Sequence, residues 1–150
     1  MFDTASLMMT LPELALSAGG LALLMVAAYL GDGSARMVSW LSVALLAVAA
    51  WLLCPAWAAG GEAFDGLYRA DAFGAFAKVL IYIAAAVSII IAPRFFAGGQ
   101  AIRAEYPILI LFACVGMGLM VSAGDMLTLY VGLELNSLAA YVLASFMRQD

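Results

Sequence analysis

The sequence predicts an all-α integral membrane protein with five transmembrane helices. Of its 150 residues, 67% are hydrophobic and only 11% are charged, whereas about half of a soluble domain is apolar. The apolar residues form long runs that suit membrane-crossing helices, and they lack the alternation of a membrane β-barrel. We expect a single transmembrane domain over residues 1–150.

The first helix is expected at residues 11–30 and the second at 37–59, with a tight polar loop between them. Pro12 suits a first helical turn, because the N–H that proline lacks has no partner there in any helix. Glu13 follows it near the membrane interface. We interpret this acid as a side chain that interacts favourably with the positive end of the helix dipole.

The third helix is expected at residues 72–92, after a polar loop that ends at Asp71. Pro93 is expected to end this helix. Lys78 lies two turns inside it, and two interpretations are open. The lysine is either a functional buried cation or a side chain that snorkels back to the nearby interface. The second interpretation is preferred.

The fourth and fifth helices are expected at residues 107–121 and 126–147, as an antiparallel hairpin with a short turn. Gly116 and Gly118 are small enough for the fourth helix to pack closely against a neighbour. Asp125 is well placed to cap the fifth helix.

A polar stripe on the fifth helix is the candidate functional site. Glu134 lies in the middle of the apolar run, where a charged side chain costs several kcal/mol. At about 3.6 residues per turn, four hydroxyl-bearing residues share its face, over a length of about 22 Å. These candidates for lining a path are Tyr130, Ser137, Tyr141 and Ser145. The stripe indicates either a helix contact with a protonated Glu134 or a proton or ion relay, and the relay is preferred.

Several kinds of site have no support in the sequence. There is no histidine, and Cys54 and Cys114 each lie in an apolar run, where small buried hydrophobic residues are common. We therefore expect no metal site and no disulfide. No basic patch indicates nucleic acid, and no glycine fingerprint or cysteine cluster indicates a dinucleotide or an iron–sulfur cluster.

The positive-inside rule predicts the orientation. On the side of the N-terminus, the loops carry only Arg69, with Lys78 as a second cation if it snorkels. The loops on the opposite side carry more cationic residues, namely Arg36, Arg94, Arg103 and Arg148. We therefore expect a multi-pass membrane protein with its N-terminus outside and the opposite side in the cytoplasm.

The last part of the chain resembles a known family. The segment GMGLMVSAGDMLTLYVGLELNSLAAYVLASFMR, Gly116 to Arg148, is similar to the N subunit of the proton-pumping NADH:quinone oxidoreductase, complex I. Two earlier segments fit more loosely, PELAL from Pro12 and DAFGAFAK from Asp71. In helix order the resemblance covers the whole chain, as the N-terminal third of a longer subunit.

The resemblance implies an antiporter-like subunit of the membrane arm, in which inverted helical repeats form proton half-channels. Its fifth helix carries a glutamate that pairs with a lysine on a later helix, and Glu134 matches that glutamate. The later lysine is not in this chain, so a complete half-channel is not expected from these residues alone. The resemblance implies that FMN, iron–sulfur clusters and quinone belong to other subunits. The expected partners are therefore the other membrane-arm subunits and the lipid bilayer.

Two other functions remain open. One is a cation/proton antiporter subunit of the Mrp kind, and the other is a non-catalytic membrane scaffold in which Glu134 is only a polar contact. The favoured function is a subunit of NADH:quinone oxidoreductase that carries no redox chemistry itself and places Glu134 in the proton path.

Overall fold

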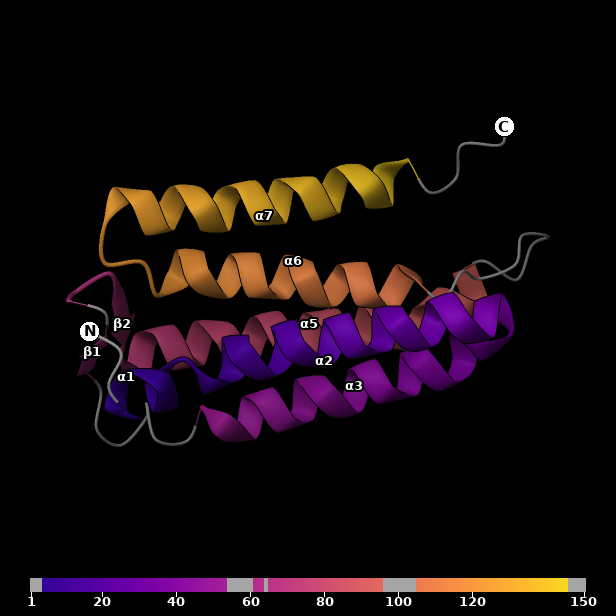
Figure 1. Ribbon diagram of the computed structural model, residues 1–150, viewed down its shortest axis with the longest axis horizontal. Helices are drawn as coiled ribbons and strands as arrows, with labels where there is room; N and C mark the ends of the chain where they lie inside the picture. Colours follow the sequence, from indigo (N-terminus) through magenta and orange to yellow (C-terminus); the bar gives the residue numbers. More distant parts are fainter. Residues whose placement is uncertain (1–3, 54–60, 64, 96–104, 146–150) are drawn as a thin grey trace.

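The computed structural model describes residues 4–53, 61–63, 65–95 and 105–145, and they form a helical bundle. The long helices run side by side, and the first short helix and the two strands lie over one end of the bundle (Figure 1). In chain order the elements are α1 (Thr4–Met9), α2 (Leu11–Leu30), the 3₁₀ helix η1 (Gly31–Ser34), α3 (Ala35–Leu52), β1 (Gly61–Ala63), β2 (Tyr68–Ala70), α5 (Ala72–Phe95), α6 (Glu105–Val121) and α7 (Met126–Ala144).

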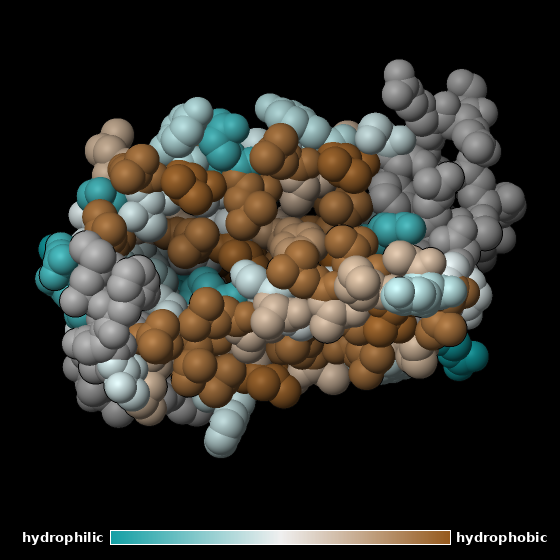
Figure 2. Space-filling model, viewed as in Figure 1, coloured by the Kyte–Doolittle hydropathy of each residue, from teal (hydrophilic) through white to brown (hydrophobic). Residues whose placement is uncertain are grey.

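Within the described residues, four helices are long and apolar enough to cross a membrane: α2, α3, α5 and α7. The fifth apolar helix, α6, is shorter, at 17 residues. Large apolar side chains point outward from the bundle, and Figure 2 shows them as a broad brown surface along its length. The outward-facing apolar surface suits lipid rather than water, and the prediction of a mostly helical membrane protein is confirmed.

Helix α6 is at the centre of the packing. It contacts α2, α3, α5 and α7, whereas α7 packs mainly on α6 and lies outermost in Figure 1. Glycine allows α6 and α7 to approach closely. A Cβ atom added to Gly116 would lie 2.8 Å from the carbonyl oxygen of Gly132 and 2.7 Å from the amide nitrogen of Asn136, both in the backbone of α7. The prediction that Gly116 packs against a neighbouring helix is therefore confirmed.

The loop predicted before the third helix contains a small antiparallel hairpin of β1 and β2, in which Glu62 pairs with Arg69. The strand β2 also contacts the turn between α6 and α7. The Arg69 amide donates to the Ser122 carbonyl oxygen at 2.7 Å, and the Gly124 amide donates to the Leu67 carbonyl oxygen at 2.9 Å. The segment was predicted only as a polar loop, and the hairpin within it was not predicted, because its backbone partners come from a turn distant in the sequence.

Several predicted helix ends also differ from the structure. Helix α3 begins at Ala35 and ends at Leu52, with Leu53 already in a turn, so the predicted extension toward residue 59 was wrong as far as the described residues reach. Helix α5 continues past position 93 to Phe95, because proline in a last turn removes one hydrogen bond without stopping the helix. Helix α6 begins two residues earlier than predicted, at Glu105.

Helix α7 begins at Met126 as predicted but ends at Ala144, three residues before the predicted end, and residues 146 and 147 lie outside the described part. The predicted cap is confirmed: the Thr128 amide donates to Asp125 Oδ1 at 2.9 Å. At α2, Pro12 occupies the first turn as predicted.

We predict that Gly116→Leu separates α6 from α7. The added side chain meets backbone atoms of α7, which cannot rotate away, and overpacking of this kind typically costs about 1–3 kcal/mol. Thermal unfolding of the detergent-solubilised protein measures the loss. Gly33→Ala is the matched control, because a Cβ atom there has no neighbour within 4 Å. Equal melting temperatures for the two variants would contradict the close packing.

Candidate functional site

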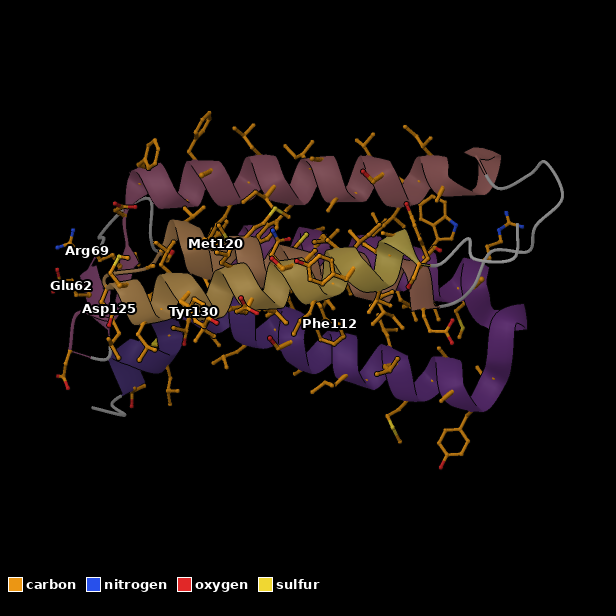
Figure 3. The ribbon with its side chains drawn as sticks, turned by 90° about the horizontal axis from the view of Figure 1, so that it is seen from above. Glu62, Arg69, Phe112, Met120, Asp125 and Tyr130 are labelled. Atoms are coloured by element: carbon orange, nitrogen blue, oxygen red, sulfur yellow. The ribbon has the colours of Figure 1, made fainter. Side chains whose placement is uncertain are left out.

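The predicted stripe lies along α7, on a face that the described helices leave uncovered. The side chains of Tyr130 and Tyr141 are 59% and 69% exposed. Glu134 and Ser145 are exposed as well, and Ser137 is half-buried. The buried residues of this helix, Gly132 and Ala139, are on the side that meets α6. Figure 3 looks down on α7 and shows Tyr130 along it, near the end where Glu62, Arg69 and Asp125 gather.

A second polar group, which the sequence did not predict as a site, is buried between α2, β2 and α5. The Lys78 amine nitrogen lies 2.6 Å from Glu13 Oε1 and donates to the Tyr68 hydroxyl at 2.6 Å. The Tyr68 hydroxyl in turn donates to Glu13 Oε2 at 2.8 Å. The lysine nitrogen also lies 4.7 Å from the centroid of the Tyr68 ring, within the range of a cation–π interaction. We call these three residues the buried triad.

The buried triad overturns the preferred interpretation of Lys78 and adds a partner for Glu13. The Lys78 and Glu13 side chains are only 3% and 6% exposed. Snorkelling of Lys78 to the interface was therefore wrong. Glu13 lies in the first turn of α2 as predicted, but its carboxylate is buried against Lys78 and Tyr68. Both side chains stay inside because each provides the opposite charge that the other needs there. The glycine at position 118 leaves room for them, since a Cβ atom there would lie 3.0 Å from Glu13 Oε1.

One signal in the sequence could have revealed the pair. The predicted first and third helices begin on the same side of the membrane, and each carries one opposite charge within two turns of that end. An acid and a base at similar depth in an apolar medium are natural partners. Nothing in the sequence marked Tyr68, because it reaches the pair through the hairpin and the hairpin was not predicted.

Tyr68 remains a neutral phenol at physiological pH. Burial raises the pKa of its hydroxyl far above the ordinary value, and the charge and the hydrogen bond of Glu13 raise this pKa further. A phenol can donate one hydrogen bond and accept others. Tyr68 is therefore fixed as the acceptor from Lys78 and the donor to Glu13.

Two buried hydroxyls near the triad have no hydrogen-bond partner among the described residues. Ser122 Oγ lies beside Tyr68, and the Tyr82 hydroxyl lies one turn beyond Lys78 on α5, within electrostatic reach of Glu13. Both residues are only 2% exposed. A buried polar group usually finds a partner, either in the protein or in ordered water. Two hydroxyls close to the triad therefore have hydrogen-bonding capacity that the described residues do not use.

In the described part of the chain, His, Cys, Asp and Glu side chains do not gather in a group of three that suits a metal ion. The chemistry that this arrangement offers is instead that of proton exchange, between an amine, a phenol and a carboxylate in direct contact.

Comparison with known proteins gives a consistent set of relatives. No family model matches the chain. The chain is 65% identical to NADH-quinone oxidoreductase subunit N of Rhizorhabdus wittichii, over 98% of the chain and 31% of that relative. The chain is 52% identical to NADH-quinone oxidoreductase subunit N of Erythrobacter litoralis, over 97% of the chain and 31% of that relative. It is 53% identical to the subunit N of Sphingopyxis alaskensis, over 98% of the chain and 30% of that relative. The chain therefore spans 31% or less of the length of these three relatives.

We predict that Tyr68→Phe destabilises the protein by about 1–3 kcal/mol, because it leaves a buried carboxylate oxygen and a buried lysine donor without their shared partner. The matched control is Tyr29→Phe, at a tyrosine that is 84% exposed, where the change should stay within about 0.5 kcal/mol. Thermal or chemical unfolding in detergent gives both values. Indistinguishable stabilities would show that the hydroxyl of Tyr68 contributes little to the buried triad.

Proposed function

The chain is related over nearly its whole length to NADH-quinone oxidoreductase subunit N, and we propose that it acts as part of a membrane-arm subunit of complex I. In this role it couples electron transfer from NADH to quinone with the translocation of protons. The relationship carries the proposal, and the apolar helices agree with a protein that works inside a membrane.

We propose that Glu134 belongs to the proton path. It is the ninth residue of α7, which places it about 13 Å from the start of the helix and near its middle. An ionisable side chain at this depth is expected to face a partner or water rather than lipid. The described helices leave this face of α7 open, so the partner in our proposal is another part of the complex. The hydroxyls of Tyr130, Ser137, Tyr141 and Ser145 are proposed to orient water along the path.

In this proposal α6 is a fifth transmembrane span, which forms an antiparallel hairpin with α7. Its length of 17 residues corresponds to about 25 Å, which is short for a span facing lipid. Its place in the middle of the bundle, between α2, α3, α5 and α7, suits a short helix because its neighbours cover most of it.

We propose further that the protein resides in the bacterial cytoplasmic membrane with its N-terminus outside. Arg69 is in the hairpin near the N-terminus and Arg36 near the opposite end (Figure 1). Arg103 and Arg148, which also entered the prediction, lie outside the described residues. Redox cofactors, namely FMN, iron–sulfur clusters and quinone, are proposed to belong to other subunits, and the direct partners are proposed to be other membrane-arm subunits and lipid.

We predict that Glu134→Gln, in the full-length subunit of the assembled complex, lowers proton pumping and the coupled NADH:quinone turnover. The amide keeps the size of the side chain and loses the exchangeable carboxyl proton. Glu134→Asp should be milder because it keeps the carboxylate and only shortens its reach. The measurement is the proton gradient in reconstituted vesicles, recorded together with NADH oxidation.

Equal content of complex in the variant and parent membranes is the control for assembly. Unchanged pumping by the Gln variant would reduce Glu134 to a structural contact and favour a scaffold subunit. Sodium-driven transport without NADH would favour an antiporter of the Mrp kind.

For the orientation, we predict that a membrane-impermeant thiol reagent added from outside labels Glu62→Cys and spares Gly33→Cys. Both positions are tested in a background without the native cysteines. Glu62 is in the exposed β1–β2 hairpin, and Gly33 is in the turn at the other end of the bundle. The reverse labelling pattern would place the N-terminus inside.

A further inference from the structure

We propose that Glu13, Tyr68 and Lys78 form a second proton-exchanging site, separate from the stripe on α7. In this site a proton moves between the Lys78 amine and the Glu13 carboxylate, and Tyr68 connects the two. The ligand of the site is a proton, which it holds on either of two groups.

The ion pair between Glu13 and Lys78 is poorly compensated for its burial. A carboxylate has about four lone-pair sites, but among the described residues the polar contacts of Glu13 are those to Lys78 and Tyr68. Its Oε1 atom makes no hydrogen bond of good geometry, although it lies 2.6 Å from the lysine nitrogen. Removing two charges from water costs several kcal/mol for each ion, and this cost is recovered only when further hydrogen bonds complete the site. Burial therefore weakens the preference for the ion pair over the neutral pair.

The hydrogen bonds of the triad run in one direction, from the lysine through the tyrosine to the carboxylate. Lys78 donates to the Tyr68 oxygen, and the Tyr68 hydroxyl donates to Glu13. When one proton passes from Lys78 to Tyr68 and the tyrosine passes its own proton to Glu13, one N–H bond and one O–H bond break and two O–H bonds form. The ammonium becomes an amine that keeps the electron pair, the carboxylate becomes a carboxylic acid, and Tyr68 is again a phenol. The total charge does not change.

The buried triad lies close to one end of the bundle. Glu13 is the third residue of α2 and Lys78 the seventh of α5, which places both within about 10 Å of the same end of the bundle. The β1–β2 hairpin and the α6–α7 turn lie at this end (Figure 1). The unpartnered hydroxyls of Ser122 and Tyr82 leave room in the hydrogen-bond network for water next to the triad.

The remaining titratable groups around the triad come from three elements. Asp71 precedes α5 and acts electrostatically on Lys78. Tyr82 is on α5, and Cys114 of α6 lies near Tyr82. Within the described part of the chain, these groups leave Glu13 as the carboxylate in contact with the lysine.

The test is infrared difference spectroscopy on the full-length subunit in its assembled complex. A protonated carboxylic acid has a C=O stretching band apart from the carboxylate bands, and this band shifts in D₂O. Glu13→Gln removes the Glu13 contribution completely. Lys78→Met removes the cation, so that the buried Glu13 is held as the neutral acid and gives the intensity of one full carboxylic acid. Glu134→Gln is measured in parallel to identify the band of Glu134.

We expect the native protein to show a Glu13 band of intermediate intensity, between the absence in Glu13→Gln and the full band in Lys78→Met. A native spectrum equal to that of Glu13→Gln would establish a static ion pair and overturn the proposal. A native band as strong as that of Lys78→Met would also overturn it, because the proton would stay on Glu13.

Tyr68→Phe keeps the test decisive if Lys78→Met does not fold. It retains the ring and removes the hydroxyl that joins the two charges, so the intensity of the Glu13 band must change. An unchanged band would overturn the role of Tyr68. The result is independent of the function proposed for Glu134, since impaired pumping by Glu134→Gln is compatible with a static Glu13.

Discussion

The contact between Glu13 and Lys78 determines how one end of this bundle is built. It joins α2 to α5 in a medium where neither charge can be stable alone. It also determines what lies around it, since α6 has a glycine at position 118 where a larger side chain would press on the carboxylate. Tyr68 reaches the pair because β2 lies across this end, and β2 is held by backbone bonds to the turn that precedes α7. Direct contacts therefore connect α2, α5, β2 and the turn before α7.

The two halves of the bundle meet the membrane differently. Helices α2, α3 and α5 surround α6 and expose apolar side chains on their outer faces. Helix α7 is attached to α6 by close backbone contact at Gly116 and Gly132, and its outer face carries Glu134 among hydroxyl groups. The apolar faces suit lipid, and α7 also exposes apolar side chains such as Leu133 and Leu138. The polar stripe on α7 suits a protein or water-lined surface. The exposed polar stripe agrees with the proposal that Glu134 meets another part of the complex.

Much of this architecture could be predicted from the sequence, because long apolar runs and caps such as Asp125 are local signals. The close packing at Gly116 could also be predicted, since small residues are enriched where membrane helices approach each other closely. The hairpin could not be predicted, because Arg69 and Leu67 find their backbone partners at Ser122 and Gly124, far along the chain. Considered singly, Glu13 and Lys78 each had an ordinary explanation at the interface. Their pairing depends on how α2 and α5 lie relative to each other, and the hydrophobic pattern of each helix does not specify this.

The order in which the helices are synthesised determines when the buried triad can form. Helix α2 leaves the ribosome before α5, so Glu13 enters the membrane region while its cation has not yet been made. Until then the acid, in the first turn of α2, has to remain at the aqueous boundary or accept a proton. Only after α5 has inserted can Lys78 draw it inward, and only after α6 and α7 have emerged can β2 find its backbone partners in the turn. This end of the bundle therefore takes its final form only after α6 and the turn that follows it have emerged, and the triad forms only when α2 and α5 begin at the same end of the bundle.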